Sequence, residues 1–168
     1  MLRSMALTAE SPHSLDDVRR AFDAPAYWRS RLGAFEGGSP TLDSLDTDSS
    51  GTTTVVMTMR FGGDQLPDPI RRLRLASLVI VQREHWRSVD DGNVRGEIAI
   101  DALKTPISGT GSVLMAPAGT GTQLAGTATV KVNVPLIGGP IATFVVGQLA
   151  TGIVDVVRVT DSWLFEQS

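Results

Sequence analysis

The sequence predicts an α+β fold in which a curved antiparallel sheet of about six strands is covered by a long C-terminal helix. Three observations predict it. Apolar and polar residues alternate with period two through residues 41–134, which is typical of strands. After residue 137, apolar residues recur at three- and four-residue steps, which is typical of a helix. Signals for two short helices lie before residue 41. The connections between the strands are short, which favours antiparallel neighbours. A chain of 168 residues fits one domain, so we expect a single domain over residues 1–168.

The first forty residues predict one strand followed by two short helices. The strand is expected at 2–8, and Ser14 opens a capping-box pattern for a helix that runs through Phe22. Asp23 can cap the second helix, which the Gly37-Gly38 pair would end. Its apolar positions are Tyr27, Trp28, Leu32 and Phe35.

The remaining chain predicts strands and then one long helix. The strands are expected at 42–46, 53–61, 75–88, 93–102, 107–117 and 121–134. Between 61 and 75, the segment GGDQLPDPIRRL predicts a loop with a short helix. A turn Pro-Leu-Ile-Gly-Gly-Pro leads into a helix of roughly 25 residues that spans most of 138–165. A helix of that length can bury its apolar stripe only by lying across the sheet.

Hairpin geometry predicts which side chains face the core. A three-residue turn at 90–92 gives the cross-strand pairs Trp86–Gly96, Glu84–Ile98, Gln82–Ile100 and Ile80–Ala102. This face is mainly apolar, so Glu84 and Gln82 are expected to point inward. An inward carboxylate must be paired, hydrogen-bonded or hydrated. Glu84 is therefore either a structural hydrogen-bond partner near the sheet rim or a polar anchor inside a cavity, and the sequence identifies no inward cation for it.

The next hairpin predicts a patch of small residues on the same inner face. A two-residue turn at Gly119-Thr120 brings together Gly109, Gly111, Gly126 and Ala128. The middle of the long helix is also rich in small residues, including Gly147 and Gly152. Either the helix packs closely against the sheet there, or an internal space remains.

Four segments carry a resemblance to a known superfamily. They are PAYWRSRL in the second helix, VQREHWR in the long strand, APAGTGTQL at the late hairpin and KVNVPLIGGPIATFV entering the last helix. With the order of elements, they resemble the helix-grip fold of the START-like (SRPBCC) superfamily, in an actinobacterial branch of unknown function. The resemblance covers nearly the whole chain and implies a sheet wrapped around the helix, with a cavity for an apolar or amphipathic ligand. It implies no particular reaction, because members include lipid carriers, hormone receptors, polyketide cyclases and co-chaperones.

Composition and missing motifs narrow the function classes. The net charge of −3 disfavours nucleic-acid binding, and the absence of cysteine suits a reducing compartment. We expect no integral membrane segment and no secretory signal, hence a cytoplasmic protein. His13 and His85 have no spacing that suggests a catalytic partner, and we expect no metal site and no cofactor. The arginines 71, 72 and 74 fit a solvated helix face better than a guide for an anionic head group.

These observations favour a noncatalytic carrier or sensor for a small apolar or lipid-like ligand. Gln82 and Glu84 would be polar anchors in an apolar pocket. The pocket walls are expected to be Met57, Met59, Ile80, Trp86, Ile98, Ile100, Val113, Val130, Ile141, Val145 and Leu149. One alternative is a cyclase or hydratase that uses Glu84 as acid or base. Another is an interaction module that uses the outer sheet face or the arginine cluster, and the sequence leaves the oligomeric state open.

Overall fold

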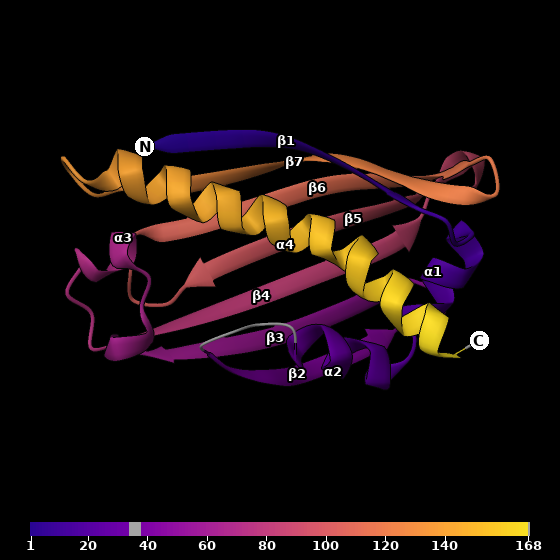
Figure 1. The fold of residues 1–168 in the computed structure, drawn as a ribbon, viewed down its shortest axis with the longest axis horizontal. Coiled ribbons are helices and arrows are strands. Elements are labelled where there is room, and N and C mark those ends of the chain that lie inside the picture. Colours follow the sequence, from indigo (N-terminus) through magenta and orange to yellow (C-terminus); the bar gives the residue numbers. More distant parts are fainter. Residues whose placement is uncertain (34–37, 168) are drawn as a thin grey trace.

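The computed structural model describes residues 1–33 and 38–167, and seven strands form one antiparallel sheet in the order β1-β7-β6-β5-β4-β3-β2 (Figure 1). The strands are β1 (Leu2–Ser11), β2 (Ser39–Thr47), β3 (Thr53–Gly62), β4 (Ser77–Ser88), β5 (Val94–Ala102), β6 (Ile107–Ala118) and β7 (Gly121–Val132). The helices are α1 (Leu15–Ala21), α2 (Pro25–Gly33), α3 (Asp68–Arg71) and α4 (Gly138–Gln167), with short 3-10 turns at Gly63–Gln65 and Asp90–Gly92.

The predicted fold class is confirmed. Each expected strand is present, with ends that differ by at most three residues, and the sheet has seven strands where about six were expected. The C-terminal helix has 30 residues, a little longer than expected. The expected helix position Phe35 and the glycine expected to end that helix, Gly37, lie outside the described residues.

Both predicted hairpin registers are confirmed. Glu84 pairs with Ile98, and Val113 pairs with Gly126. The turns supply the reason, because Gly92 and Gly119 have φ angles of +73° and +61°, which glycine adopts without steric cost. A slip of one residue would turn every apolar side chain of a strand to the opposite face.

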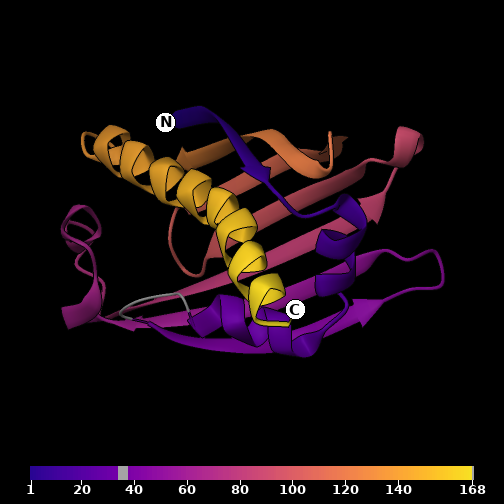
Figure 2. The ribbon, with the colours of Figure 1, turned by 45° about the vertical axis from the view of Figure 1, so that its right-hand side comes forward.

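The long helix α4 crosses one face of the sheet diagonally (Figures 1 and 2). Its buried stripe includes Ile141, Val146, Leu149, Ile153 and Val156, and it packs on β1, β7 and β6. The helix has the length and the hydropathy of a membrane span, with a mean hydropathy of 1.6 over its most apolar 18 residues. Because 44% of that window is buried against the sheet, this composition is weak evidence for a membrane segment.

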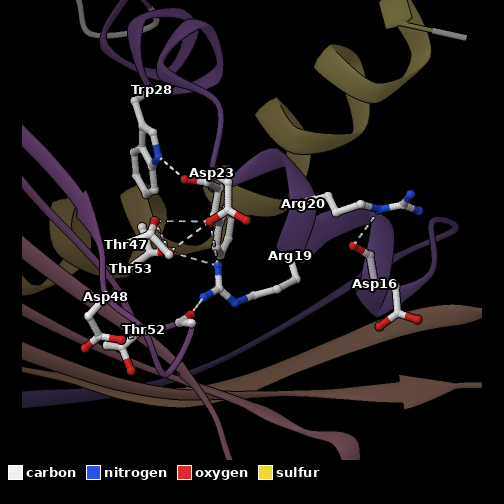
Figure 3. A network of polar contacts seen from close by, with 11 residues as sticks. Asp16, Arg19, Arg20, Asp23, Trp28, Thr47, Asp48, Thr52 and Thr53 are labelled. Carbon is white, nitrogen blue, oxygen red and sulfur yellow. Dashed lines mark hydrogen bonds and ion pairs between the residues drawn. The ribbon is translucent and has the colours of Figure 1, made fainter.

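The end of the molecule that holds the C-terminus is closed by α1 and α2. Arg19 of α1 reaches across to the β2–β3 hairpin, where it donates hydrogen bonds to Thr53 Oγ1 at 2.9 Å and to the Gly51 carbonyl (Figure 3). Thr47 and Thr53 in turn donate to the carboxylate of Asp23. These bonds attach both helices to the sheet, and we refer to this end as the closed end.

Candidate functional site

Glu84 lies at the centre of a buried polar network on the inner face of the sheet. Its partner is Arg31, which α2 places over the same face, and the side chains of both residues are buried. Arg31 Nη1 donates to Oε1 at 2.8 Å and Nη2 donates to Oε2 at 3.0 Å. This two-pronged arrangement matches the planar guanidinium to the carboxylate and is the strongest geometry such a pair can adopt. Arg31 is thus the inward cation that the sequence alone left unidentified.

Two further donors complete the contacts of the carboxylate. Trp86 Nε1 donates to Oε1 at 3.0 Å, and Gln82 Nε2 donates to Oε2 at 2.6 Å. Glu84 therefore accepts four hydrogen bonds, which is about the full capacity of a carboxylate. Of the two interpretations that the sequence left open, this geometry fits the structural hydrogen-bond partner.

Arg31 is held from its other side by an aromatic ring. Its guanidinium carbon lies 4.8 Å from the centre of the Trp28 ring, which is within the range of a cation–π contact. Burial is the largest single influence on the pKa of Arg31 and lowers it, but the charges and hydrogen bonds of Glu84 and Tyr27 together outweigh burial, so that the pKa lies above its ordinary value. Arg31 consequently stays charged inside the protein.

Tyr27 extends the network from α2 to α4. Its hydroxyl lies 2.7 Å from Thr160 Oγ1, and Thr160 donates its own proton to the Val156 carbonyl at 2.6 Å, so Tyr27 is the donor between the two. The Tyr27 ring also lies at 5.1–5.8 Å, centre to centre, from the rings of Phe22, Trp28 and Trp163. The closed end is therefore packed with aromatic side chains.

Tyr27 is the single tyrosine of the chain, which makes its ionisation directly measurable. Burial raises the pKa of Tyr27 to about 12, against an ordinary value of 10.0. We expect tyrosinate absorbance of the folded protein to appear near pH 12, and near pH 10 after denaturation. Since the folded pKa is the higher one, stability from this group is complete below pH 10 and declines as the pH rises towards 12. A midpoint near pH 10 in the folded protein would contradict the buried position.

The thirteen predicted pocket residues divide into two groups by burial. Nine are buried: Met57, Met59, Glu84, Trp86, Ile98, Val113, Val130, Ile141 and Leu149. Four are only partly buried, although they belong to the inner face or to α4: Ile80, Gln82, Ile100 and Val145. The partly buried strand residues gather towards the end of the sheet that is remote from α1, where Gln82 pairs with Ile100 and Ile80 pairs with Ala102.

The patch of inner-face glycines is occupied by side chains of α4. A methyl group added at Gly109 would lie 3.2 Å from Leu149 Cδ2, and one added at Gly111 would lie 2.7 Å from Ile153 Cδ1. The glycines therefore make room for large helix residues. At Gly147 and Gly152 such a methyl group would meet no atom within 4 Å from the described residues beyond the neighbouring backbone of α4, so these two positions do not face the sheet glycines. At this place the helix is tightly packed on the sheet.

A recess of about 540 Å³ lies on the outer face of the sheet, opposite to the predicted pocket. Its lining is Thr54, Arg83, Glu84, His85, Glu97, Ile98, Ala99, Thr110, Gly111, Ser112, Thr127 and Thr129. Glu84 and Ile98 turn their side chains to the other face, so the recess meets their backbone. His85 is exposed there, and its Nδ1 lies 2.9 Å from Thr54 Oγ1. The side chains that line the recess are mainly polar, formed by threonine and serine hydroxyls together with the side chains of Arg83, His85 and Glu97, unlike the apolar pocket that the sequence predicts.

Arg31 is the site residue that sequence reasoning missed, although a local signal for it exists. It follows Tyr27 by four residues and Trp28 by three, so it lies on the apolar face of α2. A charged residue on such a face requires a buried partner. Within the described parts of the chain, no group of three or more His, Asp or Glu side chains could hold a metal ion.

Sequence comparisons match nearly the whole chain. A family model described as "Protein of unknown function (DUF2505)" matches residues 6–164. An uncharacterised protein of Mycobacterium tuberculosis is 27% identical over 170 residues, covering 98% of both chains, and one of Mycobacterium bovis matches equally well.

Solved structures extend the comparison to more distant proteins. The crystal structure of Ara h 8.0201 has a TM-score of 0.61 at 8% identity and covers 99% of both chains. Norcoclaurine synthase from Thalictrum flavum, solved with dopamine and hydroxybenzaldehyde, has a TM-score of 0.56 at 13% identity, covering 100% of this chain and 89% of the enzyme. These neighbours confirm the helix-grip fold, and at such low identity they show the fold alone.

Proposed function

The chain belongs to the DUF2505 family, and we propose that it is a noncatalytic carrier or sensor that binds one small apolar or amphipathic molecule between α4 and the sheet. The site we assign is smaller than the pocket predicted from sequence. It lies at the end of the sheet remote from α1, around Ile80, Gln82, Ile100 and Val145. The buried residues nearer the closed end form its packed floor.

The observation that carries this proposal is the partial exposure of inward-facing residues. Ile80 and Ile100 belong to the inner row of β4 and β5, and Val145 lies in the first half of α4, yet none of the three is fully buried. An apolar side chain on an inner face that still meets solvent has no protein atoms covering part of it. Covering it with an apolar ligand is favourable, at about 25 cal/mol per Å² removed from water.

Gln82 is the polar anchor of this site. Its Nε2 is already bonded to Glu84, which fixes the orientation of the amide, and the side chain is only partly buried. Its Oε1 accepts no hydrogen bond from any residue that the structure describes, so it is free to accept one from a ligand. We therefore expect the ligand to combine an apolar body with a single hydroxyl or N–H donor.

One solved neighbour supports a small ligand. Norcoclaurine synthase holds dopamine and hydroxybenzaldehyde in the same fold, which shows that a helix-grip protein can enclose small aromatic molecules. Glu84 is a structural residue in this proposal, because all its hydrogen-bonding positions are occupied by neighbouring donors. An acid or base in catalysis would need one of them free for the substrate. We place the protein in the cytoplasm, in keeping with its lack of cysteine.

Substituting Val145 by tryptophan tests the site directly. If there is space beside Val145, the Val145→Trp variant should stay folded, with a free energy of unfolding within about 1.5 kcal/mol of the parent. It should lower the affinity for an apolar fluorescent probe by about tenfold or more. Thr151→Trp, on the exposed side of the same helix, is the matched control and should leave probe affinity unchanged.

Native mass spectrometry of the freshly purified protein, followed by solvent extraction, should identify the natural ligand. If the parent binds no probe and Val145→Trp is strongly destabilised, the space is packed and the proposal is wrong. If both tryptophan variants lower probe affinity equally, the probe binds elsewhere on α4, and the assigned site is wrong.

A further inference from the structure

Large apolar side chains are exposed together at the end of the molecule opposite the closed end. Met1 is 54% exposed, Leu2 62%, Leu103 47% and Leu136 100%. They come from three segments that are distant in sequence: the N-terminus, the β5–β6 turn and the β7–α4 loop. Both ribbon views place the N-terminus and the start of α4 together, with α3 at the same end (Figures 1 and 2).

Backbone hydrogen bonds hold these three segments side by side. The Val132 N–H donates to the Met1 carbonyl at 2.9 Å, and the Asn133 N–H donates to the Pro106 carbonyl at 3.1 Å. The first bond joins the N-terminus to the end of β7, and the second joins the β7–α4 loop to the β5–β6 turn. We call this surface the basic-apolar tip, formed by Met1, Leu2, Arg3, Leu103, Lys104, Lys131 and Leu136.

The charges of the tip are mainly positive in a chain whose net charge is −3. The chain has only two lysines, Lys104 and Lys131, and both lie exposed at the tip. The exposed Arg72 and Arg74, next to α3, lie at the same end of the molecule. The carboxylates near them are Asp64 and Asp68 around α3 and Asp101 at the end of β5.

Leu136 is held in a conformation that leucine rarely adopts. Its φ angle is +68°, in the left-handed region that favours glycine or asparagine, and its side chain is fully exposed. Neither folding nor packing within the chain benefits from a leucine at this position. Strained backbone of this kind is a common feature of functional surfaces.

We propose that the basic-apolar tip docks on an anionic lipid bilayer. Exposed leucine and methionine side chains gain free energy by entering the interfacial region of a bilayer, and flanking lysines are attracted to anionic head groups. An acidic soluble protein would complement the charges alone, whereas a bilayer also takes up the four apolar side chains that three separate segments expose. The inference is independent of the proposed ligand site, although the partly buried Ile80 lies at the same end of the sheet and would face the membrane after docking.

Co-sedimentation of the full chain with vesicles tests the proposal. One set consists of phosphatidylcholine, the other of phosphatidylcholine and phosphatidylglycerol in equal parts. We expect binding to the anionic vesicles only, weakened by high salt. Lys104→Glu/Lys131→Glu should lower the partition coefficient by about tenfold or more. Arg29→Glu/Arg83→Glu, which makes the same charge change at exposed sites away from the tip, should lower it far less.

Leu136→Asn separates docking from folding. Asparagine tolerates the left-handed backbone, so the variant should be at least as stable as the parent, whereas vesicle binding should fall several-fold. Absence of binding to anionic vesicles would overturn the proposal, as would an equal loss in the two double variants. A parent protein that self-associates in solution, and that Leu136→Asn makes monomeric, would instead assign the tip to a second copy of the chain and overturn membrane docking.

Discussion

Replacing Arg31 by methionine is expected to lower the free energy of unfolding by about 3–5 kcal/mol, because it leaves the Glu84 carboxylate buried without its cation. Methionine keeps an apolar stem of similar length and loses the guanidinium, both its bonds to Glu84 and its contact with the Trp28 ring, so most of the effect should be electrostatic. Domains of this kind are stable by only about 5–15 kcal/mol, so the loss is a large part of the total. The shift of the urea midpoint, followed by far-ultraviolet circular dichroism, measures it.

Two companion variants show whether the ion pair is the cause. Arg29→Met changes an exposed arginine on the same helix, one that pairs with no carboxylate among the described residues, and should shift stability by less than about 0.5 kcal/mol. The double variant Arg31→Met/Glu84→Gln removes both charges while keeping an acceptor for Trp86 Nε1, and it should recover most of the loss. If Arg31→Met lowers the free energy of unfolding no more than Arg29→Met does, the Arg31–Glu84 pair does not hold α2 on the sheet. The structural role assigned to Glu84 is then wrong.

Gly126→Ala should destabilise the protein by about 3 kcal/mol or more, because the added methyl group would meet backbone. It would collide with the Ser112 carbonyl oxygen and lie 2.8 Å from Val113 Cα, and neither atom can move without disrupting the β6–β7 pairing. Gly111→Ala is the matched control on the neighbouring strand. Its methyl group would approach only the flexible end of Ile153 within 3.4 Å, so we expect a cost of less than about 1 kcal/mol.

Urea unfolding of the two glycine variants checks this difference. If both variants lose stability by a similarly large amount, α4, and not the backbone of β6, limits the space above these glycines. If both lose only a little stability, β6 and β7 can separate locally at Gly126. Either result would contradict the close strand approach described for this pair.

The fold was predictable because its signals are local. Residue periodicity distinguishes the strands from α4, and the turn residues Gly92 and Gly119 determine the hairpin registers. The inward position of Glu84 follows from that register with no further information. Its partner did not follow, because Arg31 lies 53 residues earlier and the angle at which α2 packs on the sheet is a tertiary property.

The extent of the pocket was not predictable for a related reason. A glycine on an inner face indicates missing volume, but it does not tell which neighbour fills that volume. At Gly109 and Gly111 the side chains of Leu149 and Ile153 fill it, whereas no such cover lies fully over Ile80 and Ile100. Coverage depends on where α4 crosses the sheet, and hydrophobic periodicity does not determine that position.

The pairing of β1 with β7 also affects how the chain folds as it is made. Leu2 pairs with Lys131, so the first strand to leave the ribosome has no partner until the last strand is complete. At about 5–20 residues per second, the roughly 120 residues between them take on the order of 10 s to synthesise. Throughout that interval β1 is an unpaired strand that other nascent chains or chaperones can bind. Pairing between residues this distant in sequence is slow. We therefore expect the pairing of β1 with β7 to complete the sheet, although β1 is synthesised before the other six strands.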